Sequence, residues 1–234
     1  MVENTEKLKV TQTRIVHRIT LKRFIASIFN SFNIERGGIY TLKRLFYNPG
    51  SMTIHYLGIG RFQYTAPFRM LILSTALALL IINWMGFTSD FMQGVAEGSK
   101  KLSSDQISRI QEFISSYFNL ILWLFIPIIA FFSWLFNLKK PYNYAENIVL
   151  NTNIMIVSNF LMFIYLLTPY ITSQWVFYIY AISTVVYFLI SYRTFFVKSV
   201  IRSLFDLVLI MLLSYITYSI LLSIIIFTVL KFTN

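Results

Sequence analysis

The chain has 234 residues, of which 57% are apolar, 18% are aromatic and only 12% are charged, and its formal net charge is +11. This composition excludes an ordinary soluble domain and predicts an all-α integral membrane protein. Since the chain has no cysteine and only two histidines, we expect no disulfide, no transition-metal site of the usual ligand count and no cofactor.

Residues 1–66 predict a basic, helical region on the cytosolic face of the membrane. Within it, residues 8–35 have apolar side chains at positions i, i+3, i+4 and i+7 and a row of cations four residues apart, which is typical of an amphipathic helix. A second short helix is expected over residues 40–47, where the Asn-Pro-Gly sequence at 48–50 ends it, and a third over residues 51–57.

This basic region has two interpretations. Its helices can lie on the inner leaflet with their cations on anionic lipid. Alternatively, they form a cytosolic subdomain that binds a specific anion, either a nucleotide, an oligonucleotide or the acidic surface of a partner protein. The candidate anion-binding residues are Arg14, Arg18, Lys22, Arg23, Lys43, Arg44 and Arg61.

Residues 67–234 predict a bundle of five transmembrane helices. Each apolar run has about 20 residues, the length that crosses a hydrocarbon core of about 30 Å. With the N-terminus inside, sixteen of the 20 Lys and Arg residues lie on the cytosolic side, so the positive-inside rule selects an N-in, C-out topology. The expected spans are 67–87, 115–137, 148–168, 175–191 and 204–230.

The second span is expected to be preceded by a helix and bent in its middle. Residues 88–114 are interpreted as an outer connector, and a short helix capped by Ser103 or Ser104 is expected to run directly into the span. Pro127 lies near the centre of the span, where it removes one backbone hydrogen bond. Pro127 is therefore a candidate hinge, and a static bend is the alternative.

Polar side chains follow each of the last three spans at helical spacing. They either form hydrogen bonds between helices or line a hydrated path that closes by dewetting at aromatic constrictions. Four or more subunits would build such a path more easily than one chain. The candidate residues are Asn147, Asn151 and Asn159 on the third span, Tyr180, Thr184 and Tyr187 on the fourth, and Tyr215, Ser219 and Ser223 on the fifth.

Ionisable residues argue against coupled transport and against catalysis. Only Arg69 and Asp206 lie near the membrane interior, whereas a proton-coupled or ion-coupled transporter typically places a charge near mid-bilayer. Asp206 is expected to pair with Arg202 or to favour the positive end of its own helix. The remaining acids show no motif spacing, and residues 58–60 lack the context of a phosphate-binding loop. We therefore expect no enzymatic activity.

One segment of the chain carries a recognisable series of residues: Tyr40 to Phe46, Asn48-Pro49-Gly50, Tyr56-Leu57, Arg61, Tyr64 and Pro67-Phe68. This series resembles the central motif of a family of uncharacterised multi-pass membrane proteins of bacteroidete-type bacteria, described only as a domain of unknown function. The resemblance covers roughly residues 20–90 and implies a bacterial inner-membrane location. Family members often begin with a cysteine-rich, zinc-ribbon-like segment, whereas this chain has no cysteine, and many carry a lysine where this chain has Gly60.

The resemblance supplies no function, so the function hypotheses rest on the residues. The leading hypothesis is an oligomeric channel or pore-forming protein, gated through its basic cytosolic region by an anionic ligand or partner and similar in kind to membrane effectors of phage defence. The alternative is a non-conducting membrane protein that docks a cytosolic partner or anionic lipid. A transporter for a small apolar or zwitterionic solute comes third. The expected partners are membrane lipids, further copies of the chain, and a nucleotide, oligonucleotide or cytosolic protein.

Overall fold

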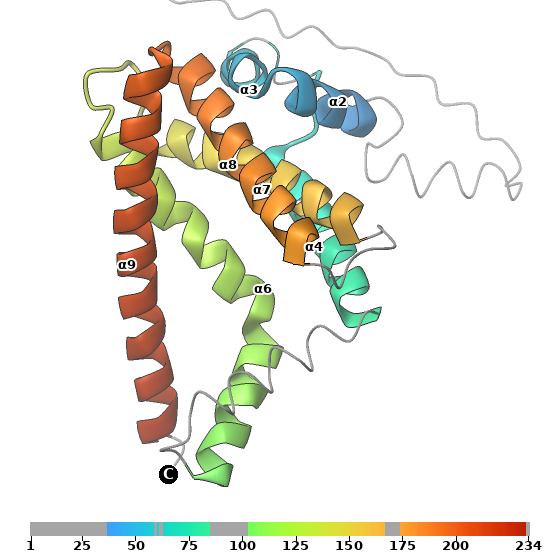
Figure 1. The fold of residues 1–234 in the computed structure, drawn as a ribbon, viewed down its shortest axis with the longest axis vertical. Helices are drawn as coiled ribbons and strands as arrows, with labels where there is room; N and C mark the ends of the chain where they lie inside the picture. Colours follow the sequence, from blue (N-terminus) through green and yellow to red (C-terminus); the bar gives the residue numbers. More distant parts are fainter. Residues whose placement is uncertain (1–36, 59, 61–62, 85–102, 167–173, 233–234) are drawn as a thin grey trace, which may run out of the picture.

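A computed structural model describes residues 37–58, 60, 63–84, 103–166 and 174–232 (Figure 1). The described residues are helical or lie in turns and links, which confirms the all-α prediction, whereas the expected helix over residues 8–35 lies outside them. The helices are α2 (Ile39–Tyr47), α3 (Pro49–Leu57), α4 (Pro67–Trp84), α6 (Ser104–Leu135), α7 (Tyr144–Leu166), α8 (Gln174–Phe196) and α9 (Val200–Phe232).

Helices α6, α7, α8 and α9 are each long and apolar enough to cross a membrane. The chain is therefore a multi-pass membrane protein. Helix α4 is also apolar, but its apolar stretch, Pro67–Leu80, is shorter than those of the other four helices. Large apolar side chains stay exposed along these helices, as Ile201 (83%) and Phe227 (67%) do on α9, and such a surface suits contact with lipid tails rather than water.

Helix α6 begins at Ser104, well before the expected span, because a capping box stabilises its start. The Ser103 hydroxyl accepts a hydrogen bond from the Gln106 backbone N–H at 3.3 Å, and the Gln106 side chain accepts one from the Ser103 N–H at 3.0 Å. This confirms the predicted cap at Ser103. The residue of α6 with non-helical backbone angles is Tyr117 (φ −114°, ψ 17°), where the helix changes direction.

The Asn-Pro-Gly sequence at 48–50 ends α2 after Tyr47 as expected, but the next helix begins two residues earlier than expected. Asn48 alone separates α2 from α3 (φ −153°, ψ 69°), and Pro49 is the first residue of α3, where its missing N–H costs little. Gly50 lies inside α3 against α8. A Cβ atom added to Gly50 would lie 2.0 Å from the Thr194 hydroxyl oxygen and 2.5 Å from the Phe195 backbone nitrogen. Glycine is therefore needed for α3 to pack this closely on α8.

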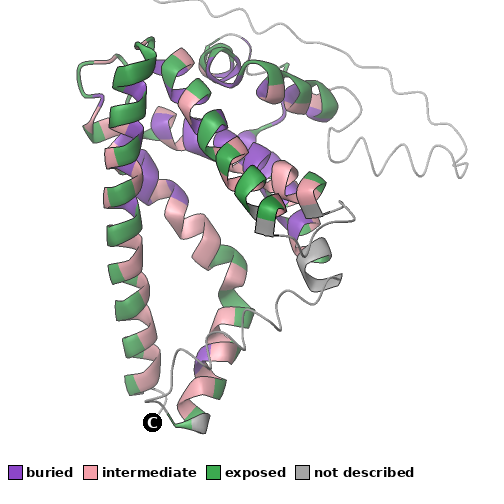
Figure 2. Cartoon of the chain, viewed as in Figure 1, coloured by how far each residue is buried: buried purple, intermediate pink, exposed green. Residues whose placement is uncertain are grey.

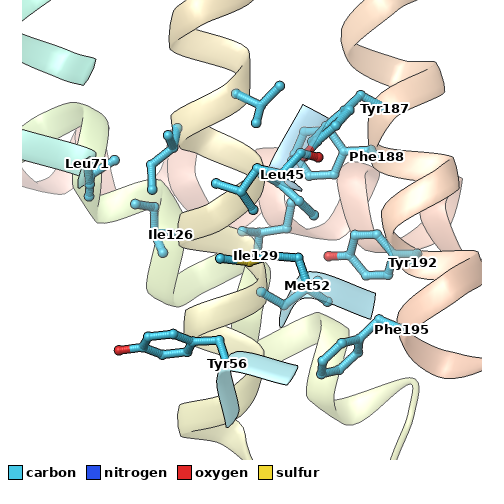
Figure 3. Close-up of a cluster of buried hydrophobic side chains, with 14 of the residues drawn as sticks. Leu45, Met52, Tyr56, Leu71, Ile126, Ile129, Tyr187, Phe188, Tyr192 and Phe195 are labelled. Carbon is cyan, nitrogen blue, oxygen red and sulfur yellow. The ribbon is translucent and has the colours of Figure 1, made fainter. Parts of the chain in front are cut away.

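The core lies at the end of the bundle that α2 and α3 cover. Helix α7 is central and contacts α2, α3, α4, α6 and α8. Fully buried side chains such as Leu45, Ile154 and Phe195 meet there (Figure 3), and the buried residues gather in this half of the molecule (Figure 2). The far halves of α6 and α9 are half-buried or exposed. Within the described residues, the bundle is therefore most tightly packed at the end that α2 and α3 cover.

The turn between α8 and α9 corrects the expected partner of Asp206. Val197 has a positive φ of 50°, and the Lys198 N–H donates to the Arg193 carbonyl at 3.2 Å. The ammonium of Lys198 thereby forms an ion pair with Asp206, with side-chain exposures of 10% and 15%. Arg202 remains exposed. The expected Arg202–Asp206 pair was wrong because the turn brings a closer cation to the carboxylate.

Candidate functional site

A polar cavity of about 290 Å³ lies on α2 and α3, next to the segment that leads into α4. It lies at the covered end of the bundle, outside the helices that are long enough to span a membrane. The residues that line it are Tyr40, Arg44, Asn48, Ser51, Met52, His55, Gln63 and Tyr64.

Three rings form one wall of this α2–α3 pocket. Tyr40 and Tyr64 stack with ring centroids 5.6 Å apart, and His55 meets Tyr64 edge-on at 5.5 Å. The Tyr64 hydroxyl and His55 Nδ1 lie 3.0 Å apart and share a hydrogen bond in which either atom can be the donor. Burial raises the pKa of the Tyr64 hydroxyl. The bond therefore fixes the two rings relative to each other.

Gly60 and Thr41 hold this wall in place. A Cβ atom added to Gly60 would lie 2.3 Å from His55 Nδ1, so only glycine leaves room for the imidazole ring. The Thr41 hydroxyl donates to the Gly37 carbonyl and accepts from the Thr65 N–H at 2.9 Å. These bonds tie the link before α4 to α2, which fixes the position of Tyr64.

Arg44 supplies the positive charge of the pocket. Its guanidinium lies over the Tyr40 ring, 5.5 Å from the centroid, and its Nε donates to the Tyr40 hydroxyl at 3.2 Å. The hydrogen bond with Tyr40 raises the pKa of Arg44, so its charge is permanent. The two terminal nitrogens make no hydrogen bond within the described part of the chain. Tyr40 thus positions the guanidinium of Arg44, and the two terminal nitrogens have no partner among the described residues.

The predicted anion-binding residues divide into three groups. Arg44 lines the α2–α3 pocket, and Lys43 is exposed on α2 without lining it. Arg14, Arg18, Lys22, Arg23 and Arg61 lie outside the described residues. The sequence analysis missed the neutral side chains of the pocket. Their signal was present, because Asn48, Ser51 and His55 are spaced i, i+3 and i+7 and so share one face.

The polar stripe of α7 forms hydrogen bonds to two neighbouring helices at the packed end of the bundle. The Asn147 side-chain oxygen accepts from the Ser133 hydroxyl on α6 at 2.8 Å. The Asn151 side-chain oxygen accepts from the Tyr192 hydroxyl on α8, also at 2.8 Å. Asn147 and Asn151 are 0% and 2% exposed, so in this structure they join helices rather than face a water-filled path.

The same stripe continues toward α3 and α4. Asn153 donates to the Thr53 hydroxyl oxygen on α3 at 3.0 Å. Asn159 donates to the hydroxyl oxygens of Ser74 and Thr75 on α4, each at 3.1 Å. The α7 amides therefore connect to every helix against which α7 packs except α2.

On α8, Tyr187 completes the hydrogen bonding of α2. The Leu45 carbonyl of α2 would ordinarily accept from the N–H four residues later, but that residue is Pro49, which has none. The Tyr187 hydroxyl donates to this carbonyl at 2.8 Å. Tyr180 instead packs edge-on against Tyr165, and the buried Thr184 hydroxyl has no hydrogen-bond partner among the described residues.

The polar stripe of α9 faces out of the bundle. Tyr215 is 68% exposed, Ser219 is half-buried, and Ser223 is exposed and donates to the Ser219 carbonyl at 2.8 Å. The predicted stripes therefore separate into an inner set on α7 and α8, in which the α7 asparagines and Tyr187 form hydrogen bonds to other helices, and an outward set on α9.

The candidate hinge Pro127 lies inside α6, where its carbonyl accepts from the Tyr144 hydroxyl at 3.1 Å.

The fold and site together define an all-helical multi-pass membrane protein with a polar pocket on the short helices α2 and α3, beside the apolar helix α4. The model of the family described as Protein of unknown function (DUF3667) matches residues 35–79. This match covers α2, α3 and most of α4, and it contains every residue that lines the α2–α3 pocket. No curated protein matches the chain. No solved structure matches it either.

Proposed function

We propose that the chain is a five-span protein of the inner membrane of a bacteroidete-type bacterium, which binds an anionic group on its cytosolic face in the α2–α3 pocket. The observation that carries the proposal is Arg44, held over Tyr40 with free terminal nitrogens beside neutral donors. The guanidinium fork matches the geometry of phosphate and carboxylate oxygens.

The arrangement of the helix ends supports the proposed topology. The described part of the N-terminal basic region, α2 and α3, lies at the same end of the molecule as the link between α6 and α7 and the turn between α8 and α9 (Figure 1). There, α3 packs against the end of α8 at Gly50, and the ring of Tyr142, which follows α6, lies 4.1 Å from that of Phe195. With this end in the cytosol, α4 serves as the first span and the chain ends outside.

The size of the pocket favours a small anion-bearing group. A cavity of about 290 Å³ is near the lower limit of ligand sites, about 300–1,000 Å³. The donors in the pocket suit a phosphate group. This group belongs either to the headgroup of an anionic lipid or to a nucleotide. These two sources share the same chemistry at Arg44 and are distinguished by experiment.

Neutralising Arg44 tests the site. In nanodiscs, Arg44→Gln is expected to weaken binding of a phosphate-bearing probe by about 10- to 150-fold, the equivalent of one charge-assisted hydrogen bond. The lipid arm compares nanodiscs with and without phosphatidylglycerol by native mass spectrometry, and the soluble arm titrates ATP by calorimetry. Lys43→Gln removes the same charge from the neighbouring exposed position outside the pocket. If the two variants lost the same amount of affinity for the probe, the α2–α3 pocket would not be the binding site.

A substitution that changes no charge tests the pocket independently. Gly60→Ala forces the His55 ring away, because the added methyl would lie 2.3 Å from Nδ1. We expect the affinity for the same probe to fall by about tenfold, since the Tyr64–His55 bond is lost while all cations remain. Gly58→Ala is the matched control, because its added methyl meets nothing closer than 3.7 Å. Unchanged binding by Gly60→Ala would exclude His55 from the site.

A pore between copies of the chain is the second candidate function. Its supporting observation is the outward stripe on α9, where Tyr215 and Ser223 are exposed and thus open to another copy. Purified protein in liposomes is tested for ion flux with and without the phosphate-bearing probe, and its oligomeric state is measured in nanodiscs. A monomer without flux leaves anion binding as the function.

A further inference from the structure

A second cavity, of about 490 Å³, lies among the long helices and is separate from the α2–α3 pocket. Helices α4, α6, α7, α8 and α9 all contribute to its wall, and most of the lining residues on α6 and α9 belong to the half-buried parts of these helices. Ala78, Phe118, Leu122, Met162, Leu222 and Ile226 represent its apolar lining.

The polar side chains in this wall are Thr75, Ser158, Asn159, Tyr180 and Tyr218, and four of these five form hydrogen bonds within the bundle. Ser158 donates to the Ile154 carbonyl at 3.1 Å. Thr75 Oγ1 accepts from Trp123 Nε1 and from the Asn159 amide, each at 3.1 Å. The Tyr218 hydroxyl donates to the Ile121 carbonyl at 3.0 Å. Water inside a cavity needs two to four polar partners, and this wall offers almost none. The cavity therefore suits hydrocarbon rather than water.

The volume of the cavity indicates the size of an occupant. An apolar cavity of about 150 Å³ holds one benzene molecule. A volume of about 490 Å³ is roughly three times larger and corresponds to about 18–20 carbon atoms on that scale. This is the size of one long acyl chain, and the bilayer around α6 and α9 supplies such chains at high concentration.

We propose that this cavity binds the hydrocarbon chain of one membrane lipid. The proposal rests on the multi-pass membrane placement of the long helices and does not depend on anion binding in the α2–α3 pocket. An acyl chain completes the apolar packing that α4, α7 and α9 leave open around this cavity.

Photo-crosslinking in nanodiscs tests the proposal. The probe is phosphatidylcholine with a diazirine near the end of one acyl chain, and the readout is the crosslinked peptide of α7 that contains Met155 and Met162, both in the cavity wall. Ala78→Phe places a ring in the cavity, because Ala78 is 4% exposed and lines it. Leu80→Phe is the control on the same helix, since Leu80 is 68% exposed.

We expect the α7 crosslink to fall several-fold in Ala78→Phe and to stay unchanged in Leu80→Phe. An equal yield in the two variants, or crosslinks confined to outward-facing residues, would overturn the proposal. Native mass spectrometry of the unmodified protein gives a second measurement that does not depend on how the variant folds. It should show one lipid retained per chain after delipidation, and a lipid-free chain of unchanged stability would also overturn the proposal.

Discussion

Gly50→Ala is expected to separate α3 from α8 and to lower the free energy of unfolding by about 1–3 kcal/mol, the usual cost of overpacking. The added methyl would overlap the Thr194 hydroxyl and the Phe195 backbone nitrogen. Movement of Thr194 cannot relieve the second overlap, because it involves main chain. The buried bond between Thr53 and Asn153 would be strained in turn, since it joins the same helix α3 to α7.

Thermal unfolding in detergent and hydrogen exchange of α2 and α3 measure this effect. Gly58→Ala serves as the control, because it makes the same change at the end of α3 where the added methyl meets nothing closer than 3.7 Å. The control should match the unmodified protein in both measurements. Equal stability of the two variants would show that α3 does not pack on α8 as described.

Tyr187→Phe is expected to destabilise the protein by about 1–3 kcal/mol, because it leaves a buried carbonyl without a donor. Leu45 is 0% exposed, and Pro49 cannot supply the hydrogen bond that the Leu45 carbonyl would receive in a continuous helix. Removing the single oxygen atom of Tyr187 creates no large cavity, so the loss reports on the hydrogen bond.

Tyr215→Phe is the matched control, since it removes the same oxygen from an exposed ring on α9. Its effect on stability should be within about 0.5 kcal/mol. Unfolding by a graded denaturing detergent compares the two variants. If Tyr187→Phe alters ion flux in liposomes without changing stability, Tyr187 lines a path rather than joining α8 to α2.

Helix positions were predictable because their causes are local. The long apolar runs follow from composition, and the start of α6 follows from the Ser103 and Gln106 pair, which satisfies free N–H groups within one turn. The sequence at 48–50 correctly predicted the end of α2 but not the start of α3 at Pro49, because proline and glycine suit a turn as well as a helix start and a close helix contact. Only the position of α8 decides between these uses.

The candidate site was predictable in part for the same reason. Arg44 stood out by its charge and by its place in a basic helix, whereas nothing in the local sequence marked His55 as a site residue. Its role depends on Tyr64, which lies on a separate segment, and on the space above Gly60. Likewise, the partners of the α7 asparagines lie on helices that sequence spacing cannot bring together.

The contact between Tyr187 and Leu45 has a consequence for biosynthesis. The two residues are 142 positions apart, and a ribosome adds about 5–20 residues per second. Helix α2 therefore waits about 7–28 s after its synthesis before α8 can supply the missing donor. During that interval the part of α2 and α3 that packs on α8 in the finished protein lacks its final partner, so a chaperone or the membrane surface must cover it.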